Sequence, residues 1–132
     1  SVELVRVPGA CALVTGVAPG GRGVRWAGAG TRVGAVETLG TGCSRHGFRT
    51  GAFVGSSILD HRFGLGRGFG VYDEAVNSDQ QGASESLDAE RPAGAVADAA
   101  LRWLRQTGPR PFFAWIHFYD AHAPYAPPPP YR

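Results

Sequence analysis

A run of aromatic and β-branched residues near the C-terminus constrains the fold more than any other part of the chain. Positions 112–119 read FFAWIHFY, a composition typical of a strand that is buried on both faces in a parallel sheet. Because proline lacks the N–H that a sheet ladder needs, Pro124 and the prolines at 127–130 predict that the strand ends near Asp120. Polar groups therefore follow the carboxyl end of a buried strand, which is where open α/β sheets bind their ligands.

Helices and strands alternate along the chain from residue 36 onward. Gly47 follows the first helical segment, and Gly108 with Pro109 follows the second, as expected for helix ends. The expected order is helix, strand, helix, strand at residues 36–46, 48–54, 89–106 and 111–119. This alternation predicts an α/β fold that contains part of a doubly wound, mostly parallel sheet flanked by helices. Since two strands alone do not form a stable sheet, we expect further strands elsewhere.

The helix expected at 89–106 carries one apolar stripe. Val96, Ala100 and Leu104 recur at every fourth position, which places them on one face of the helix. We expect this face to pack on a parallel sheet that contains strands near 49–54 and 111–118.

We expect residues 1–132 to belong to a single domain, with loops between the predicted elements. Residues 1–34 are rich in glycine and small side chains. Residues 2–7 are a candidate short strand that Pro8 ends, and residues 11–14 form a second short apolar segment. Residues 61–72 carry aromatic side chains among glycines, which predicts a compact loop held by its aromatic residues. Residues 73–88 are polar and predict a mobile loop.

Composition excludes several classes of function. A net charge of +2 is too small to indicate binding to nucleic acid or to an anionic membrane. No apolar run approaches about 20 residues, so we expect no membrane span, and no signal peptide is visible, which leaves the localisation open. All 13 basic residues are arginine, so no lysine can serve as a Schiff base or a general base. The chain starts with Ser1 and contains no methionine, so we expect it to be part of a longer protein.

Two pairs of chemically notable residues have structural interpretations. Cys11 and Cys43 are in neither a zinc-binding nor a redox spacing, and free cysteines commonly behave as small buried apolar residues. A disulfide between them stays open at this stage. Asp60 and Asp73 follow glycine-rich turns, and we interpret both as structural.

Two long segments of the chain resemble the bacterial sulfatases of the alkaline phosphatase superfamily. They read RHGFRTGAFVGSSILDHRFGLGRGFGVYDE at 45–74 and ERPAGAVADAALRWLRQTGPRPFFAWIHFYDAHAPYAPPPPYR at 90–132. The resemblance is most specific at the DxHxPY pattern of 120–125, and VPGACALVTGVAPGGRGV at 7–24 resembles the signature helix of the family. It implies an alkaline phosphatase-like α/β fold and hydrolysis of small-molecule or glycan sulfate esters, with formylglycine and Ca²⁺ as cofactors. It also implies a periplasmic or secreted enzyme.

The signature segment is where the chain departs most from that family. Alignment on this segment puts Arg6 where the family has the Cys or Ser that becomes formylglycine. Gly9 and Ala10 stand where a Ser and an Arg support that conversion, and Arg22 replaces a His. The family's calcium ligands lie outside these 132 residues, so we expect this chain alone to hold neither cofactor.

His122 is the site residue that the resemblance retains. It matches the sulfate-contacting histidine of the family's P-H-x-P motif, and an imidazolium there could donate to a sulfate oxygen. Ser56 and Ile58 stand near the positions of a Lys and a His that grip the sulfate in the family. A metal site built from His117, Asp120 and His122 is an alternative. Strand alternation puts His117 and Asp120 on opposite faces, which favours a core role for His117 and a turn role for Asp120.

Three functions fit these residues. The first is a sulfatase-like hydrolase, of which the present chain is an inactive part. The second is a non-catalytic relative, in which Arg6 and Arg22 stand in place of residues that the reaction needs. The third is a phosphoesterase or phosphotransferase of the same superfamily that uses a Thr or Ser nucleophile.

Overall fold

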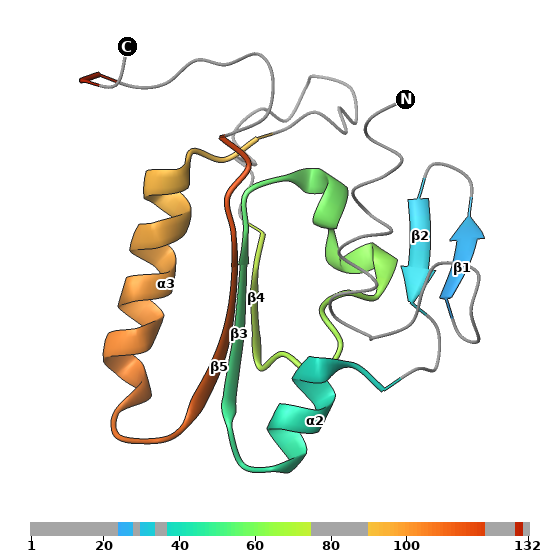
Figure 1. The fold of residues 1–132 in the computed structure, drawn as a ribbon, viewed down its shortest axis with the longest axis horizontal. Helices are drawn as coiled ribbons and strands as arrows, with labels where there is room; N and C mark the ends of the chain where they lie inside the picture. Colours follow the sequence, from blue (N-terminus) through green and yellow to red (C-terminus); the bar gives the residue numbers. More distant parts are fainter. Residues whose placement is uncertain (1–23, 28–29, 34–36, 75–89, 121–128, 131–132) are drawn as a thin grey trace.

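The computed structural model describes residues 24–27, 30–33, 37–74, 90–120 and 129–130. These residues form a small parallel sheet, two helices, two short 3₁₀ turns and a separate hairpin (Figure 1). The sheet strands are β3, β4 and β5, at Arg49–Val54, Val71–Asp73 and Phe112–His117. The helices are α2 and α3, at Leu39–Arg45 and Ala93–Thr107. The 3₁₀ turns η2 and η3 span Ser57–Leu59 and His61–Phe63, and the hairpin strands β1 and β2 span Val24–Ala27 and Gly30–Val33.

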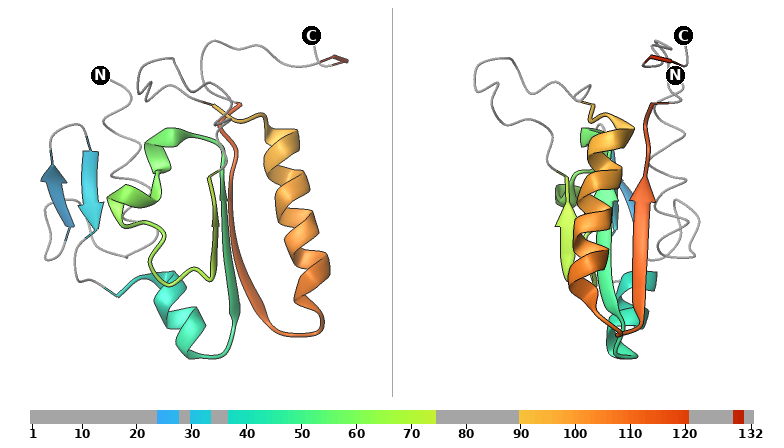
Figure 2. Two further views of the ribbon diagram at one scale, coloured as in Figure 1. Left: turned by 180° about the vertical axis from the view of Figure 1, so that it is seen from behind. Right: turned by 90° about the vertical axis from the view of Figure 1, so that its left-hand side faces the viewer.

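The sheet has the strand order β4-β3-β5, and both outer strands run parallel to β3. β3 pairs with β5 from Arg49–Phe112 to Val54–His117, and with β4 from Gly51–Val71 to Phe53–Asp73. The right-hand view of Figure 2 shows β4 and β5 on opposite sides with α3 in front of them. The predicted α/β fold with parallel strands at the two predicted positions is therefore confirmed.

One face of the sheet packs against α3. Val96 and Ala100 are buried, and Leu104 packs against the same cluster, as the apolar stripe predicted. Phe53 of β3 meets Trp103 of α3 with a ring-centroid separation of 5.7 Å. A Cβ at Gly51 would lie 2.9 Å from Cε2 of Trp103, so the indole reaches the strand only because position 51 has no side chain.

Aromatic rings cover the opposite face of the sheet. Phe69 stacks on Phe113 at 5.8 Å and lies 6.1 Å from Trp115, whose ring is 6.5 Å from that of Tyr72. The hydroxyl of Tyr72 donates to the carbonyl of Leu59 at 2.6 Å, which ties the 3₁₀ turns to β4. The predicted aromatic loop at 61–72 is thus held as expected, but its last two residues belong to β4, a strand that was not predicted.

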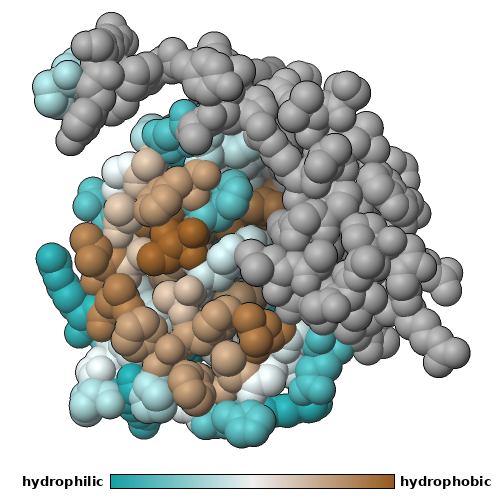
Figure 3. Space-filling view, in the orientation of Figure 1, coloured by the Kyte–Doolittle hydropathy of each residue, from teal (hydrophilic) through white to brown (hydrophobic). Residues whose placement is uncertain are grey.

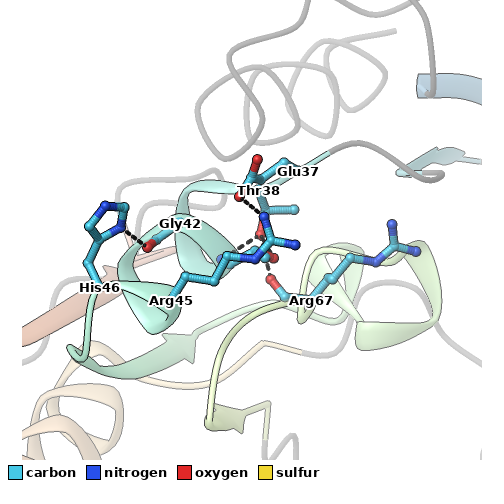
Figure 4. A network of polar contacts seen from close by, with 7 residues as sticks. Glu37, Thr38, Gly42, Arg45, His46 and Arg67 are labelled. Carbon is cyan, nitrogen blue, oxygen red and sulfur yellow. Dashed lines mark hydrogen bonds and ion pairs between the residues drawn. The ribbon is translucent and has the colours of Figure 1, made fainter.

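Helix α2 begins at a threonine cap (Figure 4). Oγ1 of Thr38 accepts from the backbone N–H of Thr41 at 3.1 Å and contacts the carbonyl oxygen of Arg67 at 2.6 Å, to which it donates. Gly47 follows the last turn with a φ of 81°, the left-handed conformation that favours glycine after a helix. The predicted helix at 36–46 is therefore present but shorter, because Thr38 starts it late.

Two expectations need correction. The glycine-rich stretch 1–34 was expected to be loop, yet β1 and β2 form an antiparallel hairpin in which Ala27 pairs with Gly30. Asp73 was placed in a mobile loop at 73–88, but it is the last residue of β4. Residues 75–89 of the chain, which include the rest of that expected loop, lie outside the described residues, as do all of residues 1–23.

Apolar side chains are exposed along the outer side of β5. Phe112, Ile116 and Phe118 are exposed, as is Leu101 on α3. In Figure 3 apolar residues gather on the side of the molecule where Figure 1 shows α3 and β5. Within the described part of the chain, no helix combines the length and the apolar character needed to cross a bilayer.

Candidate functional site

The carboxyl ends of the three parallel strands meet at one edge of the sheet, at the top of Figure 1. The turns η2 and η3 follow β3 at this edge, and α3 begins beside it. In open parallel sheets this edge is where ligands bind, so its polar residues are the candidates for function.

Asp60, His61 and Glu74 form the main polar cluster at this edge. The backbone N–H of His61 donates to Oε2 of Glu74 at 2.7 Å, and Nδ1 of His61 contacts Oε1 of the same carboxylate. Nδ1 also lies 3.4 Å from Oδ1 of Asp60. One ligand atom from each residue lies within 4.8 Å of the others, which makes this the group of potential metal ligands among the described residues. The cluster is partly open to solvent, because His61 is exposed while the two carboxylates are half-buried.

A largely buried ion pair holds this edge together. Nη1 of Arg91 donates to Oδ1 of Asp73 at 2.5 Å, and Nη2 donates to the carbonyl of Ala95 at 3.0 Å. The backbone N–H of Arg91 donates to the carbonyl of Gly55 at 2.9 Å. Arg91 therefore joins the ends of β3 and β4 to the first turn of α3, and Asp73 has the structural role that was expected of it.

Asp120 connects the end of β5 to the start of α3. Its Oδ1 accepts from the backbone N–H of Ala93 at 3.0 Å. This contact satisfies one of the N–H groups that have no partner within the helix, and it confirms that Asp120 binds backbone N–H at a turn. His117 pairs in register with Val54, and its half-buried ring lies 6.3 Å from that of Tyr119. The structure thus places His117 at the end of β5 and Asp120 three residues beyond it, where its carboxylate contacts the first residue of α3.

Most residues that carry the family resemblance at the N-terminus, and His122 itself, lie outside the described residues. Ser56 is buried and forms an isolated antiparallel bridge with Glu90. Ile58 lies in η2. Cys43 is a free thiol, and Cys11, its partner in the possible disulfide, lies outside the described residues.

The sequence reasoning did not find the Asp60–His61–Glu74 cluster. The sequence indicates a structural role for Asp60, and Glu74 lies in the segment that it predicts to be mobile. The signal was present, because a β-branched and aromatic pair, Val71 and Tyr72, directly precedes two carboxylates after a glycine. Reading that pair as a strand end would have placed Glu74 at the same edge as Asp60.

Comparisons of the chain with protein-family models, with curated proteins and with solved structures found no match. The sulfatase resemblance therefore stays a prediction from the residues that carry it.

Proposed function

We propose that this chain is part of the catalytic domain of a sulfatase-like hydrolase and that the complete domain has the alkaline phosphatase-like fold. What supports the proposal is the position of the two resembling segments. The segment at 45–74 supplies β3 and β4, and the segment at 90–132 supplies α3 and the neighbouring parallel strand β5. Residues that follow both segments' strands therefore start from one edge of the sheet, the edge that binds ligands in such folds.

His122 is the residue to which we assign contact with the sulfate. It follows the last residue of β5 by five positions, and Asp120 anchors the intervening turn to α3. An imidazolium at this place would donate a hydrogen bond to a sulfate oxygen that gains negative charge as the ester bond breaks. One such donor contributes about 10²–10³-fold to the rate.

The described residues do not fit the calcium ion that the resemblance implies. Their one group of potential ligands, Asp60, His61 and Glu74, contains an imidazole, whereas Ca²⁺ takes about six to eight oxygen ligands. The residues that the resemblance assigns to calcium lie outside the chain. Calcium therefore has no role in the steps assigned to this chain. Arg6 cannot become formylglycine, which the family forms from a Cys or Ser at this position.

A non-catalytic relative is the second candidate, because specific residues favour it. Arg6 stands at the nucleophile position, and an arginine is neither a nucleophile nor able to lose its proton at working pH. Ser56, at the position of a sulfate-gripping lysine, is 2% exposed and is engaged with the backbone around Glu90. The isolated 132-residue chain is accordingly expected to be inactive.

An aryl sulfate assay separates these functions. The isolated chain should give no turnover above background, and its His122→Ala variant should behave identically. A longer gene product that contains the chain and supplies the nucleophile that Arg6 cannot supply should hydrolyse the aryl sulfate, and His122→Ala in that product should lower kcat/KM by about 10²–10³-fold. Absence of sulfate hydrolysis in the longer product would favour the non-catalytic relative, and preferential hydrolysis of an aryl phosphate would favour the phosphoesterase.

A further inference from the structure

Three electron-pair donors from two separate elements converge at the ligand-binding edge of the sheet. Asp60 and His61 lie at the junction of η2 and η3, and Glu74 directly follows β4. The potential ligand atoms of the three side chains lie within 4.8 Å of one another. A donor set that comes from segments 13 residues apart is brought together by the tertiary fold and not by local sequence.

The backbone fixes the positions of these donors. The N–H of Asp60 donates to the carbonyl of Ser57 at 3.0 Å, which sets the turn that presents Asp60 and His61. The hydroxyl of Tyr72 donates to the carbonyl of Leu59 at 2.6 Å, which connects β4 to the turn. Glu74 is held at the same place because its Oε2 accepts from the N–H of His61. The cluster therefore does not depend on the rotamers of the three side chains alone.

The chemistry of the donor set selects a class of ion. Nδ1 of His61 lies between two carboxylate oxygens, with Oδ1 of Asp60 at 3.4 Å, and one Nδ1 proton can bridge to only one of them at a time. The ligand atoms of the three side chains lie within 4.8 Å of one another, so small side-chain rotations would bring all three to a metal ion placed among them. Ligands about 2.0–2.1 Å from a tetrahedral metal are separated by about 3.4 Å, which matches the spacing of Nδ1 and Oδ1.

We propose that Asp60, His61 and Glu74 bind a first-row divalent transition metal, of which Zn²⁺ is the representative. One imidazole nitrogen with two carboxylates suits Zn²⁺, Mn²⁺ or Co²⁺, whereas Ca²⁺ and Mg²⁺ favour oxygen alone. Three protein ligands leave at least one coordination position for water. Binding needs the Nδ1 lone pair, so His61 would bind the metal as the neutral imidazole that carries its proton on Nε2. This site is independent of the sulfatase proposal.

Calorimetric titration of the purified 132-residue chain with Zn²⁺ tests the proposal. We expect saturable binding of one ion per chain. Glu74→Gln and His61→Gln should each lower the affinity by at least about tenfold. Glu37→Gln and His46→Gln are matched controls, because both residues are exposed and make polar contacts on α2, away from the cluster (Figure 4).

NMR of the unaltered chain locates the bound metal without relying on variants that could misfold. Substoichiometric Mn²⁺ should broaden the amide NMR signals of His61 and Glu74 before those of His46 and Glu37. The absence of saturable Zn²⁺ binding would overturn the proposal. Equal losses in the cluster variants and the control variants, or broadening centred on another part of the chain, would overturn it as well. In those cases the His61–Glu74 contact is only an ion pair that fastens the turn to β4.

Discussion

The guanidinium of Arg91 donates to the carboxylate of Asp73 at 2.5 Å, and the arginine side chain is only 9% exposed. The two residues come from the start of α3 and the end of β4, which are not neighbours in the chain. Because the pair is almost enclosed, each charge depends on the other for the interactions it has given up with water.

Asp73→Asn is therefore expected to lower the free energy of unfolding by about 2–4 kcal/mol, since it leaves the Arg91 charge enclosed without its counter-charge. Glu37→Gln is the matched control, because its ion pair with Arg45 is exposed and should change stability by less than about 1 kcal/mol. Urea unfolding followed by tryptophan fluorescence measures both. Equal effects of the two substitutions would show that the Arg91 pair is no stronger than a surface contact.

Gly51→Ala is expected to destabilise the protein by about 1–3 kcal/mol through overpacking. The added methyl group would lie 2.9 Å from Trp103 and 3.0 Å from Phe53, both in the packed core. Gly42→Ala inside α2 should instead stabilise the protein by about 0.5–1 kcal/mol, because a Cβ there meets no atom within 4 Å. Thermal unfolding of the two variants should thus shift in opposite directions, and a shared direction would contradict the packing described for Trp103.

Asp120→Ala is expected to cost about 0.5–2 kcal/mol, because the N–H of Ala93 loses its acceptor at the start of α3. Asp120→Asn keeps an acceptor oxygen and should recover most of that stability. Hydrogen exchange at the first turn of α3 gives a local readout, and protection should fall in the alanine variant alone. Unchanged exchange in both variants would mean that Asp120 does not hold the helix.

The isolated chain is expected to self-associate through the outer side of β5. Phe112 and Ile116 are exposed on a strand that has one paired neighbour, β3, among the described residues. Ile116→Lys should weaken association by about tenfold to a hundredfold, which corresponds to the burial of one such side chain. Leu39→Lys, on the exposed start of α2, is the matched control and should leave association unchanged. Sedimentation velocity over a range of concentrations measures both, and a monomer at all concentrations would refute the expectation.

The elements that could be predicted from sequence are those with a clear hydrophobic pattern of their own. The apolar run at 112–119 and the stripe of α3 each carry a clear pattern, and both elements are where they were expected. The prediction that the run is buried on both faces is wrong, because β5 is an outer strand of the described sheet and leaves Phe112 and Ile116 exposed. Strand β4 has only three residues after a glycine, and its conformation comes from pairing with Gly51, Ala52 and Phe53. Such a strand is set mainly by its tertiary neighbour, because the local signal of Val71 and Tyr72 is too short to distinguish a strand from a loop.

The candidate site could be predicted only where its residues follow a strand that has a clear pattern of its own. The position of polar residues after buried strands follows from strand order, and Asp120 binds a backbone N–H as its place before a turn indicated. The meeting of Glu74 with His61 depends on β4, and could not be predicted once β4 was missed. The hairpin of β1 and β2 was hidden because glycines around it favour loop in any local reading.

The central place of β3 has a consequence for how the chain acquires its fold. β3 is made first, but its partner in the register Arg49–Phe112 lies 63 residues later in the chain. At synthesis rates of about 5–20 residues per second, its apolar residues wait roughly 3–13 s for β5 to emerge. During that interval β4 is the one sheet neighbour already made, and it is only three residues long. A nascent chain halted before residue 112 therefore lacks the longer of the two sheet partners of β3, and synthesis of residues 112–117 supplies it.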